Sequence, residues 1–182
     1  MNSKRIIGIS FCCGLAMVLY GLARYQMDYA DEPIVGDGKD VIHVLANQKD
    51  LSTLADLINK AGLHPILEKV GSVTIVAPTN DAFNRLRDML GEDAYNRIIQ
   101  DKSQLQKLLR NHIVLNKEST DEMSTEGQLD TLGGGSILVK KSPQGTVRLD
   151  GRASIIPQGS NIDAGKGVIH SIDEVMVPDK LE

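Results

Sequence analysis

Four histidines are the residues best suited to chemistry in this sequence, because imidazole both ligates metals and transfers protons near neutral pH. They are His43, His64, His112 and His170. No two of them stand in the HExxH spacing that places a zinc pair on one helix face, although a site assembled in space stays open. His112 and His170 each lie in an apolar run, which favours core histidines whose ring nitrogens bond to the backbone. The sequence therefore predicts no metal.

Nucleophile and phosphate motifs are also missing from the sequence. No GxSxG elbow accompanies the histidines, and both cysteines, Cys12 and Cys13, lie in an apolar N-terminal run. The stretch "GSNIDAGK" has five residues between its glycines, where a P-loop has four. The stretch "GGGS" precedes a strand pattern, whereas a dinucleotide motif opens a helix. The sequence predicts neither an enzyme nor a cofactor.

Charge and aromatic content argue against nucleic acid as a partner. The net charge is −4 at pH 7 and aromatic residues make up 3% of the chain. Nucleic-acid phosphates are bound by clustered cations, and single-stranded bases stack on aromatic rings. An acidic chain with few rings suits neither contact.

The N-terminus has the pattern of an export segment. A basic pair precedes the uncharged run 6–23, whose length lies between the apolar core of a signal peptide and a spanning helix. Residues 1–24 are therefore either a signal peptide or a membrane anchor, followed by a linker at 25–39 and one domain at 40–180. In both alternatives the basic end stays in the cytoplasm. We expect an exported domain, periplasmic or secreted, that contacts the membrane only through its N-terminal segment.

An amphipathic helix opens the expected domain. Apolar residues recur at helical spacing over 51–61, with Ser52 available as N-cap and Gly62 as the left-handed residue that ends the helix. A second short helical piece is expected around 64–70. The early part of the domain is therefore predicted to be helical.

A buried strand that turns sharply into a helix comes next. The run Val73–Ala77 is continuously apolar, which is typical of a strand buried on both faces, and Pro78 ends it. Thr79 or Asn80 can cap the helix that follows. This helix presents three apolar residues on one side, namely Phe83, Leu86 and Leu90. We expect a structural joint here rather than an anion site, because no glycine lets a ligand approach.

A later helix leads into the β-rich half of the chain. The stretch "SQLQKLLRNHIV" starts with Ser103 and Gln106 in capping-box spacing and places His112 on its apolar stripe. Short β-rich runs divided by Gly, Pro and Ser follow, with a hairpin connection at 142–145. Helices first and strands after, with one early strand, predict an α+β fold.

Several segments resemble the fasciclin domain family. "TIVAPTNDAF" and "GVIHSIDEVMVP" resemble its two signature boxes, and "LLRNHIV" and "LDTLGGGSILV" resemble motifs between them. The resemblance covers residues 40–178. It implies a fasciclin-like β-sandwich wedge flanked by several helices, used outside cells as an adhesion or interaction module and not as an enzyme. The family-motif residues expected to be structural are Pro78, Thr79, Asn80, Phe83, His112, Gly167, His170 and Asp173.

The resemblance also implies a candidate partner surface. The family's adhesion contacts map to the segments around Asn111 and His112 and around Asn161 and Ile162. Asn111 replaces the family's usual tyrosine, and Asn161 lacks the carboxylate of the Asp-Ile pair that is assigned to integrin contact. We therefore expect these four residues to contact a protein or a cell-surface or matrix partner, but not in the integrin manner.

Two functions remain open from the sequence. The first is an extracytoplasmic binding or adhesion module without catalysis. The second is a carrier of an apolar small molecule, held where the sandwich and the helices part. The oligomeric state and the identity of the partner do not follow from the sequence.

Overall fold

The structure is a computed structural model that describes residues 40–178, so the predicted signal or anchor segment and the linker lie outside the described residues. Its helices are α2 (Val41–Ala46), α3 (Ser52–Ala61), α4 (His64–Lys69), α5 (Asn80–Leu90), α6 (Glu92–Gln100) and α7 (Lys102–Arg110), with 3-10 turns η1 (Lys49–Leu51) and η2 (Pro157–Gly159). Its strands are β1 (Val73–Pro78), β2 (Ile113–Leu115), β3 (Glu126–Asp130), β4 (Ser136–Lys141), β5 (Val147–Leu149), β6 (Ala153–Ser154), β7 (Ile162–Ala164) and β8 (Gly167–Ile172). Within the described range, no helix has the length and apolarity that a bilayer crossing requires.

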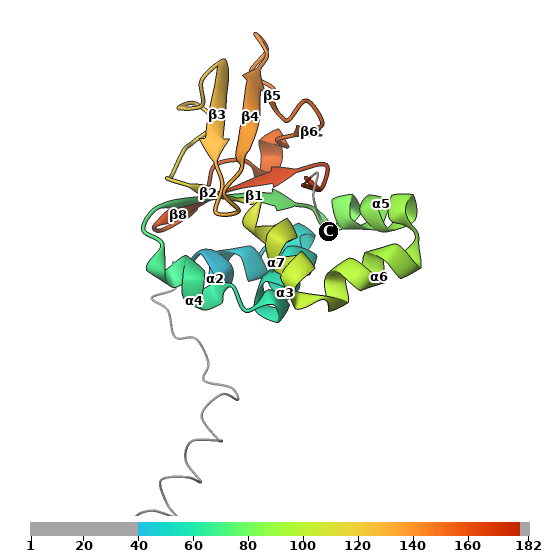
Figure 1. The fold of residues 1–182 in the computed structure, drawn as a ribbon. Coiled ribbons are helices and arrows are strands. Elements are labelled where there is room, and N and C mark those ends of the chain that lie inside the picture. Colours follow the sequence, from blue (N-terminus) through green and yellow to red (C-terminus); the bar gives the residue numbers. More distant parts are fainter. Residues whose placement is uncertain (1–39, 179–182) are drawn as a thin grey trace, which may run out of the picture. The chain divides into compact units, whose positions relative to one another are not determined.

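The strands form two sheets that pack against each other. The first sheet has the order β2-β1-β8-β7 and the second the order β3-β4-β5-β6. Strands β1 and β8 are parallel, from Val73 opposite Gly167 to Pro78 opposite Ile172, and the other named pairs are antiparallel. The helices pack below the first sheet and the second sheet stands above it (Figure 1). The predicted α+β sandwich with flanking helices is confirmed.

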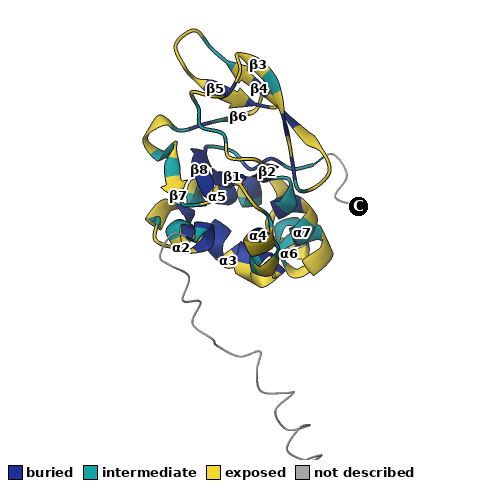
Figure 2. Ribbon diagram, turned by 90° about the vertical axis from the view of Figure 1, so that its left-hand side faces the viewer, coloured by how far each residue is buried: buried dark blue, intermediate teal, exposed yellow. Residues whose placement is uncertain are grey.

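Each boundary between layers holds its own apolar core. The core between the helices and the first sheet includes Ile75 and Phe83, and the core between the two sheets includes Val76 and Leu149. Successive strand side chains point to opposite faces, so β1 contributes to both cores. All six residues of β1 are buried, which the sequence predicts for Val73–Ala77, and β8 beside it is buried throughout (Figure 2).

The turn after β1 joins two helices to the strand. Thr79 is the N-cap of α5, and its hydroxyl accepts the Ala82 N–H at 3.2 Å. Asn80 instead caps a different helix, because its Oδ1 accepts the Thr53 N–H of α3 at 3.0 Å. The prediction that Ser52 caps α3 is wrong, since Ser52 lies inside the helix and makes no side-chain cap bond. The expected structural joint therefore extends across to α3.

Two other expectations from local pattern are corrected. The capping box of Ser103 and Gln106 is absent, because the Asp101 carboxylate already accepts the Ser103 N–H at 2.8 Å. Gln106 reaches away from this terminus and donates to the Ala61 carbonyl at 2.7 Å. Leu90 does not join the core side of α5, since 38% of it is exposed. It lies in the last turn of the helix, where the chain leaves the core.

Candidate functional site

Two hollows border the chain segment that follows β8, residues 173–178, which we call the C-terminal segment. The polar hollow has a volume of about 410 Å³ and is lined by Asn111, Ser136, Asp150, Arg152, Ala153 and residues 174–178. The apolar hollow has a volume of about 320 Å³ and is lined by Ala82, Arg85, Leu86, Met89 and Leu90 of α5, by Arg152 and by Asp173, Glu174, Val175 and Val177. The two share Arg152, Glu174, Val175 and Val177, so they adjoin along the segment, and we call them together the groove.

A buried histidine positions the C-terminal segment. His112 is 1% exposed, and its Nε2 accepts the Met176 N–H at 3.0 Å. Its Nδ1–H donates to the Leu108 carbonyl at 2.9 Å, which assigns the neutral tautomer. Burial lowers the pKa of His112 to about 4, and the bond to Leu108 opposes this shift only in part. The structure thus places His112 in the core, bonded to the backbone, with a side chain that is not open to the surface.

A second anchor holds the start of the C-terminal segment. One Asp173 carboxylate oxygen accepts the Ser154 N–H at 2.6 Å, and the Asp173 N–H donates to the Ser154 carbonyl at 3.2 Å. Val175 and Met176 are then buried against the two cores. The segment is therefore a fixed wall of the groove rather than a loose tail.

His170 plays a similar part on β8, an inner strand of the first sheet. Its Nδ1 accepts the Asn161 N–H at 3.1 Å, and its Nε2–H donates to the Glu118 carbonyl at 2.9 Å. Burial lowers the pKa of His170, and the bond to Glu118 opposes the shift. His170 thus holds two loops onto β8, as expected of a core histidine.

The expected partner residues do not form one patch. Asn111 borders the polar hollow next to β2, whereas Asn161 and Ile162 lie at β7, and β2 and β7 are the two outer strands of the first sheet. The Asn161 side chain is engaged internally, because its Oδ1 accepts the Thr120 N–H at 2.8 Å and its Nδ2 donates to the Thr120 hydroxyl at 2.7 Å. Ile162 packs partly against the core. Only Asn111 of the expected set reaches the groove.

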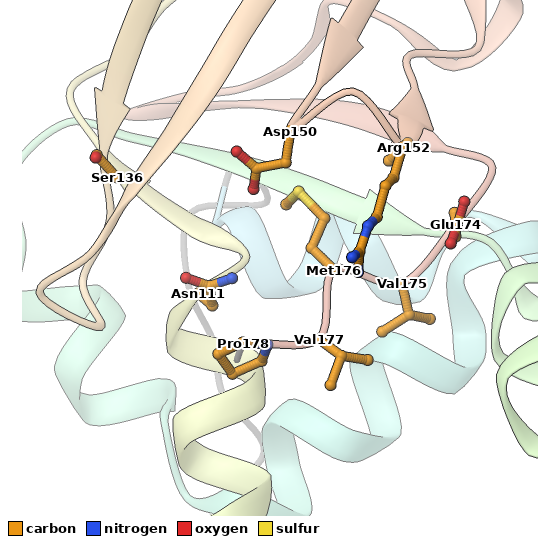
Figure 3. Close-up of a pocket in the computed structure, with 10 residues that line it drawn as sticks. Asn111, Ser136, Asp150, Arg152, Glu174, Val175, Met176, Val177 and Pro178 are labelled. Atoms are coloured by element: carbon orange, nitrogen blue, oxygen red, sulfur yellow. The ribbon is translucent and has the colours of Figure 1, made fainter. Parts of the chain in front are cut away.

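Charges of both signs surround the polar hollow. In Figure 3, Arg152 extends from the second sheet toward Met176, with Asp150 and Asn111 across the opening. The Asp150 carboxylate also accepts the Leu138 N–H at 2.8 Å. Among residues 40–178, no three His, Cys, Asp or Glu side chains are grouped so that they could hold a metal ion. The hollow offers hydrogen bonds and charges for binding.

The apolar hollow exposes large side chains that the sequence reasoning missed. Met89 is 69% exposed and Leu90 is 38% exposed, both in the last turn of α5. Leu86, one turn earlier, is buried and forms part of the hollow. Residue spacing gave no signal for this exposure, because Met89 lies three residues after Leu86 and seven after the buried Ala82, on the same side of the helix.

The remaining family-motif residues have mechanical roles in the structure. Pro78 ends β1 in a buried position and Phe83 is 3% exposed in the helix–sheet core. At Gly167 an added Cβ would lie 2.8 Å from a Val41 methyl and 2.9 Å from the Val73 carbonyl oxygen. Glycine is required there because the parallel strands and α2 leave no room for a side chain.

Comparisons with known proteins identify the family of this chain. A family model described as the fasciclin domain matches residues 49–178. Protein sll1483 of Synechocystis sp. (strain ATCC 27184 / PCC 6803 / Kazusa) is 28% identical, over 97% of this chain and 98% of that protein. Transforming growth factor-beta-induced protein ig-h3 of Sus scrofa is 29% identical over 79% of this chain, but the match spans only 20% of its length. A solved structure of a FAS1 domain pair from the insect cell adhesion molecule fasciclin I is similar in fold, with a TM-score of 0.58 and 21% identity over 72% of this chain and 46% of that chain.

Proposed function

The chain belongs to the fasciclin domain family, and from this premise we propose that it is a non-catalytic binding module that acts outside the cytoplasm and holds a protein or cell-surface partner in the groove. Fasciclin domains are in general adhesion or binding modules of extracellular proteins. The basic N-terminus followed by an uncharged apolar run supports export of this chain.

The exposed apolar hollow beside α5 is the observation that carries this proposal. Met89 and Leu90 expose large apolar surface next to each other, and charged groups, Arg85 and Glu174, stand at its border. Protein interfaces have this anatomy, with an apolar centre that excludes water inside a polar rim. A partner would place an apolar side chain in the hollow and polar groups on the rim.

Replacement of Met89 by aspartate tests the groove. The full chain and its Met89→Asp variant are used to isolate binding proteins from the cell surface that the native chain faces, with Asn59→Asp on α3 as a matched control. We expect the aspartate at position 89 to weaken capture of the same species by about tenfold or more, because a charge would enter the apolar centre. Its unfolding free energy should change by less than about 0.5 kcal/mol, since Met89 is 69% exposed. If Met89→Asp captures the same species as well as the original chain and the Asn59→Asp control do, the groove is not the binding site.

The edge at β7 is a second candidate surface for the same function. It holds Asn161 and Ile162, which the family resemblance assigns to adhesion contacts. Ile162→Asp in the same capture experiment tests this edge. Because Ile162 packs partly against the core, its unfolding free energy must be measured alongside. A loss of capture without a comparable loss of stability would move the interface from the groove to β7.

Transport of an apolar small molecule is the second candidate function. The volume of the apolar hollow, about 320 Å³, lies at the lower end of the range for ligand pockets. Organic extraction of the full chain, purified from its native source, should release a stoichiometric apolar compound if this function holds. Such a compound, lost from the Met89→Asp variant, would replace the partner model of the groove.

A further inference from the structure

Two cations face each other on the solvent side of the second sheet. Lys140 of β4 stands opposite Arg148 of β5 in the strand register, and both side chains are exposed. Side chains opposite each other on antiparallel strands have Cβ atoms about 4.5–5.5 Å apart, and like charges in that position are destabilising. The fold therefore gains nothing from this pair, and a role in binding would account for it.

One acidic residue, Glu126, stands beside the pair and borders the same hollow. Glu126 of β3 stands opposite Lys140 in the register, yet no ion pair joins the two side chains, and Arg148 forms none within residues 40–178 either. A third cation is held nearby, because the Lys141 ammonium donates to the Thr120 carbonyl at 2.9 Å. The local excess of positive charge contrasts with a net charge of −4 for the whole chain.

These cations border a hollow rich in hydroxyl groups. Its volume is about 480 Å³. Its lining combines three cations with one acidic and three hydroxyl side chains, namely Lys140, Lys141, Arg148, Glu126, Thr125, Ser142 and Thr146. The Ser142 hydroxyl accepts the Thr146 N–H at 3.1 Å, so the hairpin between β4 and β5 is ordered where it meets the hollow. Charged donors and hydroxyls thus converge on one concave surface.

The surroundings of the hollow select the class of ligand. Strands β4 and β5, which carry Lys140 and Arg148, are each paired on both sides, so a peptide backbone could add only at the outer edge of β3, one strand away from Lys140. No aromatic ring lines the hollow, so nucleobases have nothing to stack on. A sugar acid brings a carboxylate for the cations and hydroxyls for the side chains of Thr125, Ser142 and Thr146.

We propose that this hollow binds the carboxylate groups of an acidic polysaccharide through Lys140 and Arg148. The proposal rests on the proposed function, since it gives the binding module a matrix partner, but it uses a different surface from the groove. Lys140 and Arg148 supply the charge, and the hydroxyl side chains orient the sugar. Binding is therefore electrostatic and weakens as salt screens the charges.

Polygalacturonate binding to the full chain tests the proposal. Calorimetric titration should show binding at about 50 mM salt that weakens markedly at about 200 mM. The double variant Lys140→Gln, Arg148→Gln should bind about tenfold or more weakly, because it removes both opposing cations. The matched double variant Lys60→Gln, Lys69→Gln removes the same charge from exposed positions on α3 and α4 and should bind like the original chain.

Three outcomes would overturn the proposal. One is the absence of polygalacturonate binding at low salt. Another is an equal loss of affinity in the Lys60→Gln, Lys69→Gln control, which would indicate general charge attraction and not a defined site. The third is equally tight binding of polyglutamate, which would assign the hollow to acidic peptides. Methyl-esterified polygalacturonate should not bind, because it lacks the carboxylate charge.

The Met89→Asp variant of the groove separates this proposal from the proposed function and shows whether the chain is folded. Met89→Asp should bind polygalacturonate normally, because α5 does not line this hollow. If the groove loses its partner while polysaccharide binding persists, the two sites are separate. If polysaccharide binding fails while the groove still holds its partner, only the present proposal falls.

Discussion

Acidification should destabilise the domain through His112. The ring is neutral in the fold, where its pKa is about 4, whereas the ordinary value is 6.5. The unfolded chain therefore takes up the proton first, so the stability from this residue is present above about pH 6.5 and is lost as the pH falls toward 4. Complete loss amounts to about 3 kcal/mol, and the part lost between pH 7 and pH 5 is roughly 2 kcal/mol.

The hydrogen bonds of the ring explain the shift in physical terms. Protonation would place an N–H where Nε2 now accepts the Met176 N–H, in a site that water does not reach. His170 acts in the same direction, because its Nδ1 accepts the Asn161 N–H and burial lowers its pKa as well. Acid should therefore weaken the attachment of the C-terminal segment at His112 and of the loops at Asn161 and Glu118 that His170 holds.

Urea titration at pH 7 and pH 5 measures this effect. The unfolding free energy of the original chain should fall on acidification by roughly 2 kcal/mol more than that of His112→Gln, which cannot titrate in this range. The variant should start lower at pH 7, by about 1–3 kcal/mol, because its side chain cannot reproduce both bonds. If acidification costs the variant as much as the original chain, the assignment of the pH dependence to His112 is refuted.

Two further substitutions test the joint after β1. Phe83→Ala should lower the unfolding free energy by about 3–5 kcal/mol in a denaturant titration, since it removes a buried ring, and a loss under about 1 kcal/mol would show that the ring is not a core anchor. Asn80→Ala should cost about 1 kcal/mol because α3 loses its cap, whereas Asn80→Asp keeps the acceptor oxygen and should cost less. Equal losses in the two Asn80 variants would contradict the capping role.

Much of the fold could be predicted because its causes lie within a few residues. The apolar, β-branched run before Pro78 is typical of a strand buried on both faces, and Thr79 caps the helix that begins one residue later. Gly62 ends α3 with φ at +68°, in the left-handed region that glycine enters without strain. The hairpin at 142–145 joins β4 to β5 as its composition indicates, with the Gly145 N–H donating to the Ser142 carbonyl at 2.9 Å. Local hydrogen bonding and side-chain size determine each of these features.

The site depended on contacts that local pattern does not specify. The groove exists because β8 ends beside α5 and the chain then crosses to His112. The Nε2 of His112 accepts the N–H of Met176, which lies 64 residues later in the sequence. The resemblance assigns adhesion contacts to the segments of Asn111 and Asn161 alike, yet the strand order β2-β1-β8-β7 puts them at opposite edges of a sheet.

What the sequence by itself determined is therefore most of the elements, the cap of α5, the glycine end of α3, the β4–β5 hairpin, and which residues seek the core. Tertiary structure decided which of the remaining residues meet. Asn80 caps α3 and not its own helix, because packing brings the two helix starts together. Met89 and Leu90 stay exposed because nothing in residues 40–178 covers the end of α5, and Lys140 meets Arg148 only through the register of β4 and β5. Hydrophobic periodicity determines the face that is buried, but strand order and register, which arise from packing the whole chain, determine which surface residues become neighbours.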